Sequence, residues 1–285
     1  MNPYSTITAK QPPKLDYRLD LQKLIGVLPA SSLCVRPTQE IVSSGIEEVD
    51  LLTGGIPRGG ITEVCGPPTS GRTSMLLAVL AAATQRNEVC ALVDVSDAFD
   101  PVSAQSAGVN FANLLWVRCG SSPGKKPSST SNYEGKQQYF RHHAEGPVEQ
   151  AVRVTDLLLQ SGGFGLVIID LGDVSVKLAR RIPLTSWFRF QRAVENTPTI
   201  LFLITSVPCA QTCASLQLKL RASGKKLSVI NCQPSAGSRD QKQSIPSHSL
   251  LLDGLQVEGE LLRSRVQRKP VQSVTRFVTK AVRAG

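Results

Sequence analysis

The sequence has no long apolar run. Its longest nearly unbroken one, Met75 to Ala83, is far shorter than the roughly 20 residues that a membrane-spanning helix needs. The first residues, Met1 to Lys14, lack the apolar core of a signal peptide. Only three histidines are present, and none has a partner at the spacing of metal ligands. We therefore expect a cytoplasmic protein with no membrane anchor and no structural metal site.

Cysteines are few and odd in number. The seven are scattered through apparent core strands, as Cys65, Cys90 and Cys119 are. Disulfide frameworks belong to small secreted chains with paired cysteines, so this pattern indicates reduced, buried thiols. The chain has 285 residues, of which 41% are apolar and 19% charged. This composition is typical of a globular protein with one large core, or one core and a small appendage.

The charge is unevenly spread along the chain. From position 217 onward there are 13 Lys and Arg against 4 Asp and Glu, out of a net charge of +10 for the whole chain. Such asymmetry indicates a nucleic-acid or other polyanion partner, and a merely solvated tail is the alternative. Four residues that crowd one segment are our candidates for binding single-stranded DNA: Arg263, Arg265, Arg268 and Lys269. If this segment is a strand, Arg263 and Arg265 share a face.

The most informative segment is Gly66-Pro67-Pro68-Thr69-Ser70-Gly71-Arg72-Thr73. It follows a strand-like stretch and precedes a helix-like one, as a phosphate-binding loop must. In the motif Gly-x4-Gly-Lys-Ser/Thr, backbone N–H groups cradle the phosphates, the lysine reaches the outer phosphates and the hydroxyl holds magnesium. We expect these eight residues to bind ATP with Mg²⁺. Position 72 holds an arginine, whose guanidinium is planar and forked, whereas the ammonium of the motif's lysine is compact. This difference puts efficient hydrolysis in question. A loop without a ligand is the alternative.

A second apolar strand, Leu166 to Asp170, ends in a carboxylate. Phosphate-binding loops work with such an aspartate, which orients the magnesium ion or its water. We therefore expect Thr73 and Asp170 to hold Mg²⁺ through the nucleotide.

The hydrophobic pattern alternates between the two kinds of element. Strands are expected at Ile61–Cys65, Val89–Val95, Leu114–Cys119, Leu166–Leu171 and Thr199–Thr205, and helices at Ser74–Arg86, Val102–Ala107, Pro147–Gln160, Trp187–Glu195 and Ala214–Ala222. Strands so apolar on both faces predict an α/β fold whose largely parallel sheet is flanked by helices.

We expect three parts along the chain. Residues 1–40 form a helix, at 15–28, and a linker; 41–223 form the core, with a flexible insertion at 121–145; and 224–285 form a basic segment, partly β and partly disordered. The last part is expected to contain a hairpin around Asp253-Gly254.

Several ordered blocks resemble the bacterial RecA recombinase family. They are Ser44 to Leu52, the Gly-Gly-Ile-Pro-Arg-Gly run that follows, the loop Gly66–Thr73, the run Val93 to Pro101, and Ile168-Ile169-Asp170. The resemblance covers residues 40 to 206 and implies a RecA-like P-loop NTPase core. It also implies three altered positions: Arg72 stands for the family's lysine, Ser96 for its catalytic glutamate, and Ser206 for the glutamine that senses the terminal phosphate. Asp97, one residue from the glutamate position, is the candidate substitute.

This combination resembles a divergent branch, the ImuA-like RecA relatives. That likeness implies an accessory protein of SOS-type DNA repair, which supports translesion synthesis beside an error-prone polymerase or a polymerase-like partner and associates with itself or with RecA. An active DNA-dependent ATPase that forms recombination filaments is the first alternative. A nucleotide-independent interaction module, with the loop as a relic, is the second.

Aromatic residues gather at Trp187, Phe188 and Phe190, with Arg189 and Arg192 among them. Such a cluster can stack on bases. The alternative is that the aromatics belong to the core and the arginines between them are solvated.

Overall fold

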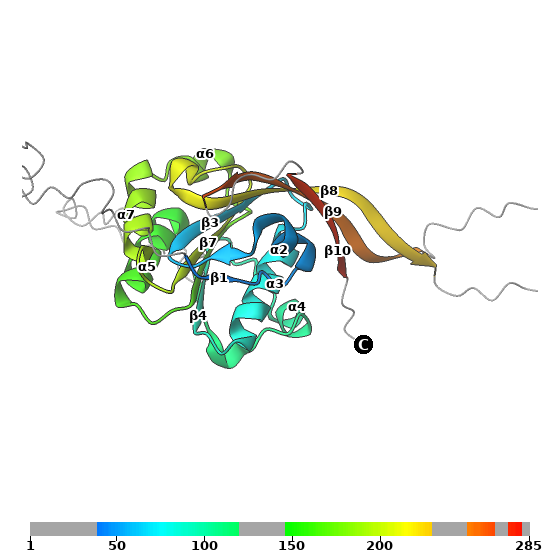
Figure 1. Cartoon of the computed structure of the whole chain (residues 1–285), viewed down its shortest axis with the longest axis horizontal. Coiled ribbons are helices and arrows are strands. Elements are labelled where there is room, and N and C mark those ends of the chain that lie inside the picture. The colour runs from blue at the N-terminus through cyan, green and yellow to red at the C-terminus, as the bar shows by residue number, and fades with distance from the viewer. Residues whose placement is uncertain (1–38, 120–145, 230–249, 266–272, 281–285) are drawn as a thin grey trace, which may run out of the picture. The chain divides into compact units, whose positions relative to one another are not determined.

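The computed structural model describes residues 39–119, 146–229, 250–265 and 273–280. Within them an eight-stranded sheet runs in the order β10–β9–β8–β3–β7–β6–β4–β5 (Figure 1). Its strands are β3 (Gly60–Cys65), β4 (Cys90–Asp94), β5 (Leu114–Arg118), β6 (Leu166–Leu171), β7 (Ile200–Thr205), β8 (Ala214–Val229), β9 (Leu250–Ser264) and β10 (Val274–Lys280). A small antiparallel pair, β1 (Ile41–Val42) with β2 (Ile56–Pro57), precedes it.

Most of the sheet is parallel. The six strands from β5 to β8 pair in parallel with their neighbours, and β8–β9 and β9–β10 are antiparallel. Every residue of β3, β4 and β7 is buried. Parallel strands are covered on both faces, which is why their sequences are continuous apolar runs.

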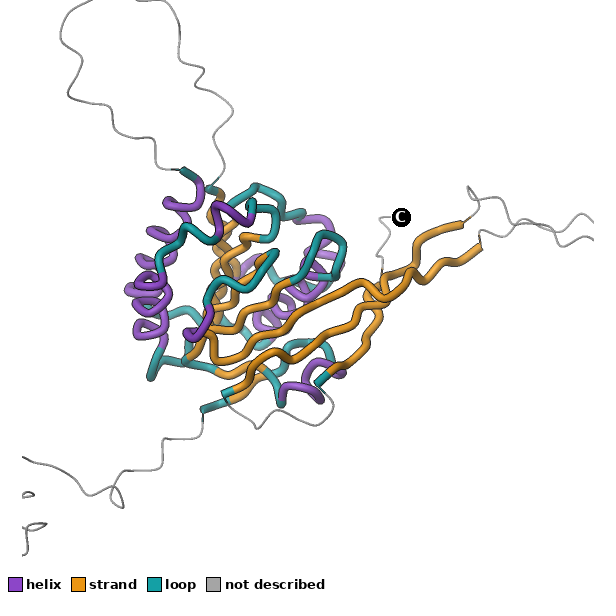
Figure 2. The backbone as a smooth tube through the Cα atoms, turned by 90° about the horizontal axis from the view of Figure 1, so that it is seen from above, coloured by secondary structure: helices purple, strands orange, loops and turns teal. Residues whose placement is uncertain are grey.

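Helices cover both faces of the sheet (Figure 2). On one face the core includes side chains of α2 (Glu47–Thr53), α3 (Arg72–Gln85) and α4 (Pro101–Ser106). On the other it includes α5 (Pro147–Ser161), α6 (Val176–Ala179) and α7 (Leu184–Val194). Successive strand residues alternate between these cores, as Ile168 and Ile169 do on β6, because strand side chains have a period of two. The fold is therefore α/β, as predicted, with a largely parallel sheet between layers of helices.

Two short 3₁₀ turns complete the described elements. Phe111–Asn113 leads into β5, and Gln211–Cys213 leads into β8. Five cysteines are free and buried: Cys65, Cys90, Cys119, Cys209 and Cys213. In the part of the chain that is described, no helix is both long and apolar enough to cross a membrane.

The helix predicted at Ala214–Ala222 is wrong, because these residues belong to strand β8. Leu216, Leu218 and Leu220 are buried in the core beside α3, while Lys219 and Arg221 alternate with them. This period of two is a strand pattern. The parallel ladder with β3 stabilises it from Ala214 to Lys219.

The hairpin predicted around Asp253-Gly254 is also wrong. β9 runs through both residues, and Gly254 pairs with Lys226 on one side and Lys280 on the other. A Cβ at Gly254 would collide with the carbonyl oxygen of Thr279. The glycine therefore permits close approach of β10 and does not form a turn.

The C-terminal strands continue the core sheet. We expected the core to end at residue 223, yet β8 extends across this position from Ala214 to Val229. The expected helix at 15–28, the insertion at 121–145 and the residues Arg268 and Lys269 lie outside the described ranges.

Candidate nucleotide-binding site

The loop Gly66–Thr73 connects the carboxyl end of β3 to the start of α3. Two of its glycines are held against the C-terminal strands. A Cβ added at Gly66 would lie 2.5 Å from the carbonyl oxygen of Leu220 on β8, and one at Gly71 would lie 2.6 Å from Val257 on β9. Gly71 also has a φ of +91°, and Thr69 adopts +61°. The loop is therefore shaped both by its own backbone and by strands that lie far along the chain.

The loop presents features that suit an anion. Helix α3 begins at Arg72 with no side-chain cap and no acidic residue in its first turn. The first N–H groups of such a helix are unsatisfied, and they attract phosphate together with the helix dipole. The hydroxyl of Ser70 is buried and has no hydrogen-bond partner. An uncapped helix start beside an unpaired buried donor fits a phosphate group.

Asp170 lies at the end of β6, where the sequence predicts it. Its Oδ1 accepts a hydrogen bond of 2.8 Å from the backbone N–H of Gly172. Burial is the main cause that raises the pKa of Asp170, to about 6. Asp170 lines a pocket of about 130 Å³ together with Thr73 and Arg72. The fold thus brings the two predicted magnesium residues to one pocket, as a parallel sheet with both strand ends at the same edge requires.

Asp173, which also lines this pocket, was not singled out in the sequence. Its position in the turn after β6, at the same sheet edge as Asp170, could have indicated it.

Arg72 does not extend along the loop. Its Nη1 donates a hydrogen bond of 2.8 Å to the carbonyl oxygen of Gly172, and its Nη2 lies 3.9 Å from Oδ1 of Asp173. The side chain is only 7% exposed. The arginine is therefore bound to the turn that follows β6, the strand that carries Asp170.

Asp94 ends β4 opposite Asp170 in the register. Its carboxylate accepts hydrogen bonds from the backbone N–H groups of Ala98 and Phe99 and from the indole of Trp116. These bonds hold the loop after β4 in place.

The candidate substitute base, Asp97, lies away from the phosphate loop's pocket. Both of its carboxylate oxygens accept hydrogen bonds from Arg118 on β5. This bond to Arg118 lowers the pKa of Asp97. The pocket is lined by Ala98, Phe99 and Asp100, and neither Ser96 nor Asp97 is among its residues. Asp100 caps α4 through the backbone N–H groups of Val102 and Ser103.

Ser206 follows β7 and has a buried hydroxyl without a partner. A buried carboxylate on the neighbouring strand β3 was not singled out from the sequence. Glu63 on β3 is fully buried and accepts hydrogen bonds from the N–H groups of Cys209 and Ala210, the hydroxyl of Thr205 and the amide of Gln217. Burial raises the pKa of Glu63. A charged residue within an apolar strand could have indicated this site. The hydrogen bonds of Glu63 hold the connection from β7 to β8 in place.

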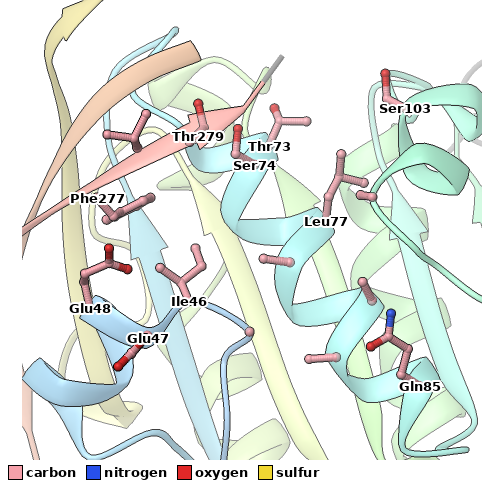
Figure 3. A pocket seen from close by; sticks show the side chains of 16 residues that line it. Ile46, Glu47, Glu48, Thr73, Ser74, Leu77, Gln85, Ser103, Phe277 and Thr279 are labelled. Atoms are coloured by element: carbon pink, nitrogen blue, oxygen red, sulfur yellow. The ribbon is translucent and has the colours of Figure 1, made fainter. Parts of the chain in front are cut away.

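A longer groove of about 770 Å³ begins at the same loop (Figure 3). Thr73 lines both this groove and the smaller pocket. Figure 3 shows Thr279 of β10 next to Thr73 and Ser74, with Ser103 of α4 on the other side. Phe277, on β10, and Leu77, on α3, add apolar surface. The groove has a mixed polar and apolar lining, and Glu47 and Glu48 of α2 also border it.

The candidate DNA-binding arginines lie at the end of β9. Arg263 donates to the carbonyl oxygen of Gln211 at 3.4 Å, and Arg265 donates to that of Thr212. Their charges are not neutralised by these carbonyls, and Arg265 is exposed.

In the α7 segment, Trp187 and Phe190 are buried and contact each other edge to face, whereas Phe188 is 46% exposed. The core alternative is therefore correct for Trp187 and Phe190.

The fold and the loop together define an α/β protein with the architecture of a phosphate-loop nucleotide-binding protein. The family model of the RecA N-terminal domain matches residues 32–123. Over 184 residues the chain is 29% identical to Protein RecA of Wigglesworthia glossinidia brevipalpis. It is 28% identical to Protein RecA of Ectopseudomonas oleovorans over the same length.

These alignments cover 59% of this chain and 48% and 45% of the two relatives. The chain thus spans about half the length of the curated relatives it matches. Over these residues the chain is therefore similar to the RecA N-terminal domain and to RecA proteins, in line with the resemblance of the sequence blocks.

Proposed function

We propose that this protein is a RecA-like accessory factor of DNA repair that binds ATP, with weak or absent hydrolysis, and supports translesion DNA synthesis. One combination of observations carries the proposal. The loop Gly66–Thr73 joins β3 to the uncapped start of α3, as a phosphate-binding loop does, while the family's lysine and glutamate positions hold Arg72 and Ser96. The similarity to RecA proteins supports nucleotide binding and a role in DNA repair or recombination in general terms.

The triphosphate is proposed to bind at the start of α3. Uncapped N–H groups and the Ser70 hydroxyl donate to its oxygens there. Thr73 and Asp170 are the residues that could hold an accompanying Mg²⁺ ion, which would neutralise phosphate charge. The base and sugar extend into the groove of Figure 3, past Ser74 towards Ser103 and Thr279.

Weak hydrolysis is supported by the surroundings of the loop. ATP hydrolysis needs a side chain that positions and activates the attacking water. Asp97 is bound by Arg118, and Ser96 is a hydroxyl that cannot accept a proton near neutral pH. The nucleotide is therefore proposed to act as a structural ligand.

DNA and protein partners complete the proposal. Single-stranded DNA binds through Arg263 and Arg265, and through Arg268 and Lys269 outside the described residues. The altered loop is what suggests an ImuA-like role in the cytoplasm. There the protein would act with an error-prone polymerase or a polymerase-like accessory protein, and would associate with itself or with RecA.

A working DNA-dependent ATPase that forms RecA-type filaments is the second candidate. Thr73 and Asp170 favour it, because both hydrolysis-linked metal residues are retained and line one pocket.

Two measurements separate the candidates. Isothermal calorimetry should detect stoichiometric ATP binding, and its absence would contradict both. Steady-state ATP turnover should stay near background with single-stranded DNA. Sustained turnover that is lost in Asp170→Ala would establish the recombinase and overturn the accessory proposal.

A restored variant supplies a positive control. Arg72→Lys with Ser96→Glu returns the family's lysine and glutamate, and general-base catalysis alone contributes about 10²-fold or more. Turnover should rise by at least about tenfold above the parent protein, with Arg72→Lys plus Ser96→Ala as the matched control.

A further inference from the structure

Arg72 is held in a defined position on the far side of the phosphate pocket. Its backbone begins α3, yet its guanidinium contacts the Gly172 carbonyl, 100 residues further along the chain. The side chain is 7% exposed, and its other nitrogen lies 3.9 Å from Asp173. A buried arginine with a carbonyl and a carboxylate around it is a fixed part of the site.

The guanidinium is also a neighbour of Asp170. A Cβ placed at Gly172 would lie 3.0 Å from Oδ1 of Asp170 and 3.4 Å from Cζ of Arg72. Both groups therefore border the same small volume. Arg72, Thr73 and Asp170 line one pocket.

This volume is where a phosphate-loop protein holds its metal ion. The metal lies between the Ser/Thr hydroxyl of the loop and the carboxylate of the second strand. In this chain the Arg72 guanidinium borders the same pocket and is fixed there by the Gly172 carbonyl. Arginine stays protonated at any ordinary pH and offers five N–H donors in a planar fork that matches phosphate oxygens. It can therefore present positive charge to the phosphate oxygens from a fixed position.

We infer that Arg72 replaces the magnesium ion, so that the site binds a nucleoside polyphosphate without needing a divalent cation. The inference rests on the nucleotide site proposed above. Asp173, 3.9 Å from the guanidinium, and the nearby Asp170 then balance the charge of Arg72. The guanidinium supplies the positive charge that Mg²⁺ supplies elsewhere. The hydroxyl of Thr73 donates to phosphate.

Replacement of lysine by arginine has a physical reason under this inference. A lysine at position 72 would be a compact, flexible point charge beside the metal. The longer, planar side chain reaches the β6 turn, where the Gly172 carbonyl fixes it. Such a site is suited to holding a nucleotide and not to moving its terminal phosphate.

The test is ATP binding by calorimetry in excess Mg²⁺ and in excess EDTA. The parent protein should bind ATP at least as tightly in EDTA as in Mg²⁺, because a site that releases the cation competes with Mg²⁺ for the nucleotide. Arg72→Lys should lose at least about tenfold in affinity when Mg²⁺ is removed, which corresponds to about 1.4 kcal/mol. Arg86→Lys is the matched control, because it makes the same change at the other end of α3, where Arg86 forms an ion pair with Glu88. This variant should behave as the parent does.

A second measurement needs no variant. Electron paramagnetic resonance of Mn²⁺ is recorded with the parent protein in excess over ATP and ATP in excess over Mn²⁺. It should show Mn²⁺ released from ATP as the nucleotide binds. Binding of ATP only in Mg²⁺, or Mn²⁺ retained in the complex, would overturn the inference and leave the nucleotide site intact. Absence of ATP binding in both buffers would overturn the nucleotide site itself, and the inference with it.

Discussion

Glu63 on β3 accepts a hydrogen bond of 2.7 Å from the side chain of Gln217 on β8, and both residues are buried. The same carboxylate accepts a bond of 2.6 Å from the backbone N–H of Cys209. One side chain therefore connects the strand that leads into the phosphate loop with the connection from β7 to β8. No basic residue contributes to these bonds, so the carboxylate is stabilised by neutral donors alone.

Glu63→Ala should destabilise the protein strongly. The substitution leaves two backbone N–H groups and the Gln217 amide buried without an acceptor, which costs about 2–4 kcal/mol in the free energy of unfolding. Chemical denaturation measures this loss. Glu195→Ala, at an exposed glutamate after α7, is the control and should change stability by less than about 0.5 kcal/mol. Equal losses in the two variants would show that the network does not stabilise the fold.

Gly71→Ala should lower the free energy of unfolding by more than the positive φ of Gly71 alone explains. Gly71 and Gly163 have φ of +91° and +83°, but only Gly71 has a neighbour, Val257, in the path of a Cβ. Gly163→Ala should therefore cost about 1 kcal/mol in the free energy of unfolding, and Gly71→Ala a further 1–3 kcal/mol or so for overpacking. Thermal or chemical unfolding compares the two. Adding Val257→Ala to Gly71→Ala should recover part of the difference, and no recovery would refute the steric explanation.

The pH dependence of stability should carry the signature of Asp170. Burial raises its pKa from 3.8 to about 6, so the folded state keeps a proton that the unfolded chain has already released. The free energy of unfolding of the ligand-free protein therefore falls as the pH rises from about 4 to about 6, by up to about 3 kcal/mol.

Asp170→Asn removes this contribution. The variant should be more stable than the parent at pH 7, and the two should converge below pH 4. Denaturation curves across this range measure the difference, which would stay constant with pH if Asp170 titrated normally.

Arg263→Ala combined with Arg265→Ala should weaken binding of single-stranded DNA. Each phosphate contact that is lost flattens the slope of log affinity against log salt by about 0.7 for single strands, so the pair should reduce it by up to about 1.4. Fluorescence anisotropy over a salt series measures this slope. Arg276→Ala removes an exposed arginine that pairs with Glu258 and should leave the slope unchanged. An unchanged slope in the double variant would exclude these arginines from the DNA contact.

The parallel strands could be predicted closely from the sequence. The bounds of β6, Leu166–Leu171, are those expected, because a strand that is buried on both faces is an uninterrupted apolar run. β8 could not be predicted in the same way. Its first residues carry leucines at a spacing of two, and it is the ladder with β3 that makes this short pattern a strand.

The position of the segment Gly66–Thr73 between a strand and a helix was predicted from its motif, since glycine spacing and the flanking elements are local properties. Three long-range contacts were not predictable. The Gly172 carbonyl accepts a hydrogen bond from Arg72, which lies 100 residues away in the sequence. Glu63 accepts one from the backbone N–H of Cys209, which lies 146 residues away. Asp97 is paired with Arg118 on a neighbouring strand. A motif contains no information about such distant contacts.

The amino-acid sequence alone determined the alternation of strands and helices, the place of the segment Gly66–Thr73 between a strand and a helix, and the identities of Arg72, Ser96 and Ser206, because each depends on neighbouring residues or on residue type. Only the tertiary structure decided where the Arg72 guanidinium lies, that Trp187 and Phe190 belong to the core, and that β8 to β10 extend the sheet. These outcomes depend on which surfaces meet when the chain packs, and burial and hydrogen bonding between distant segments are settled only then.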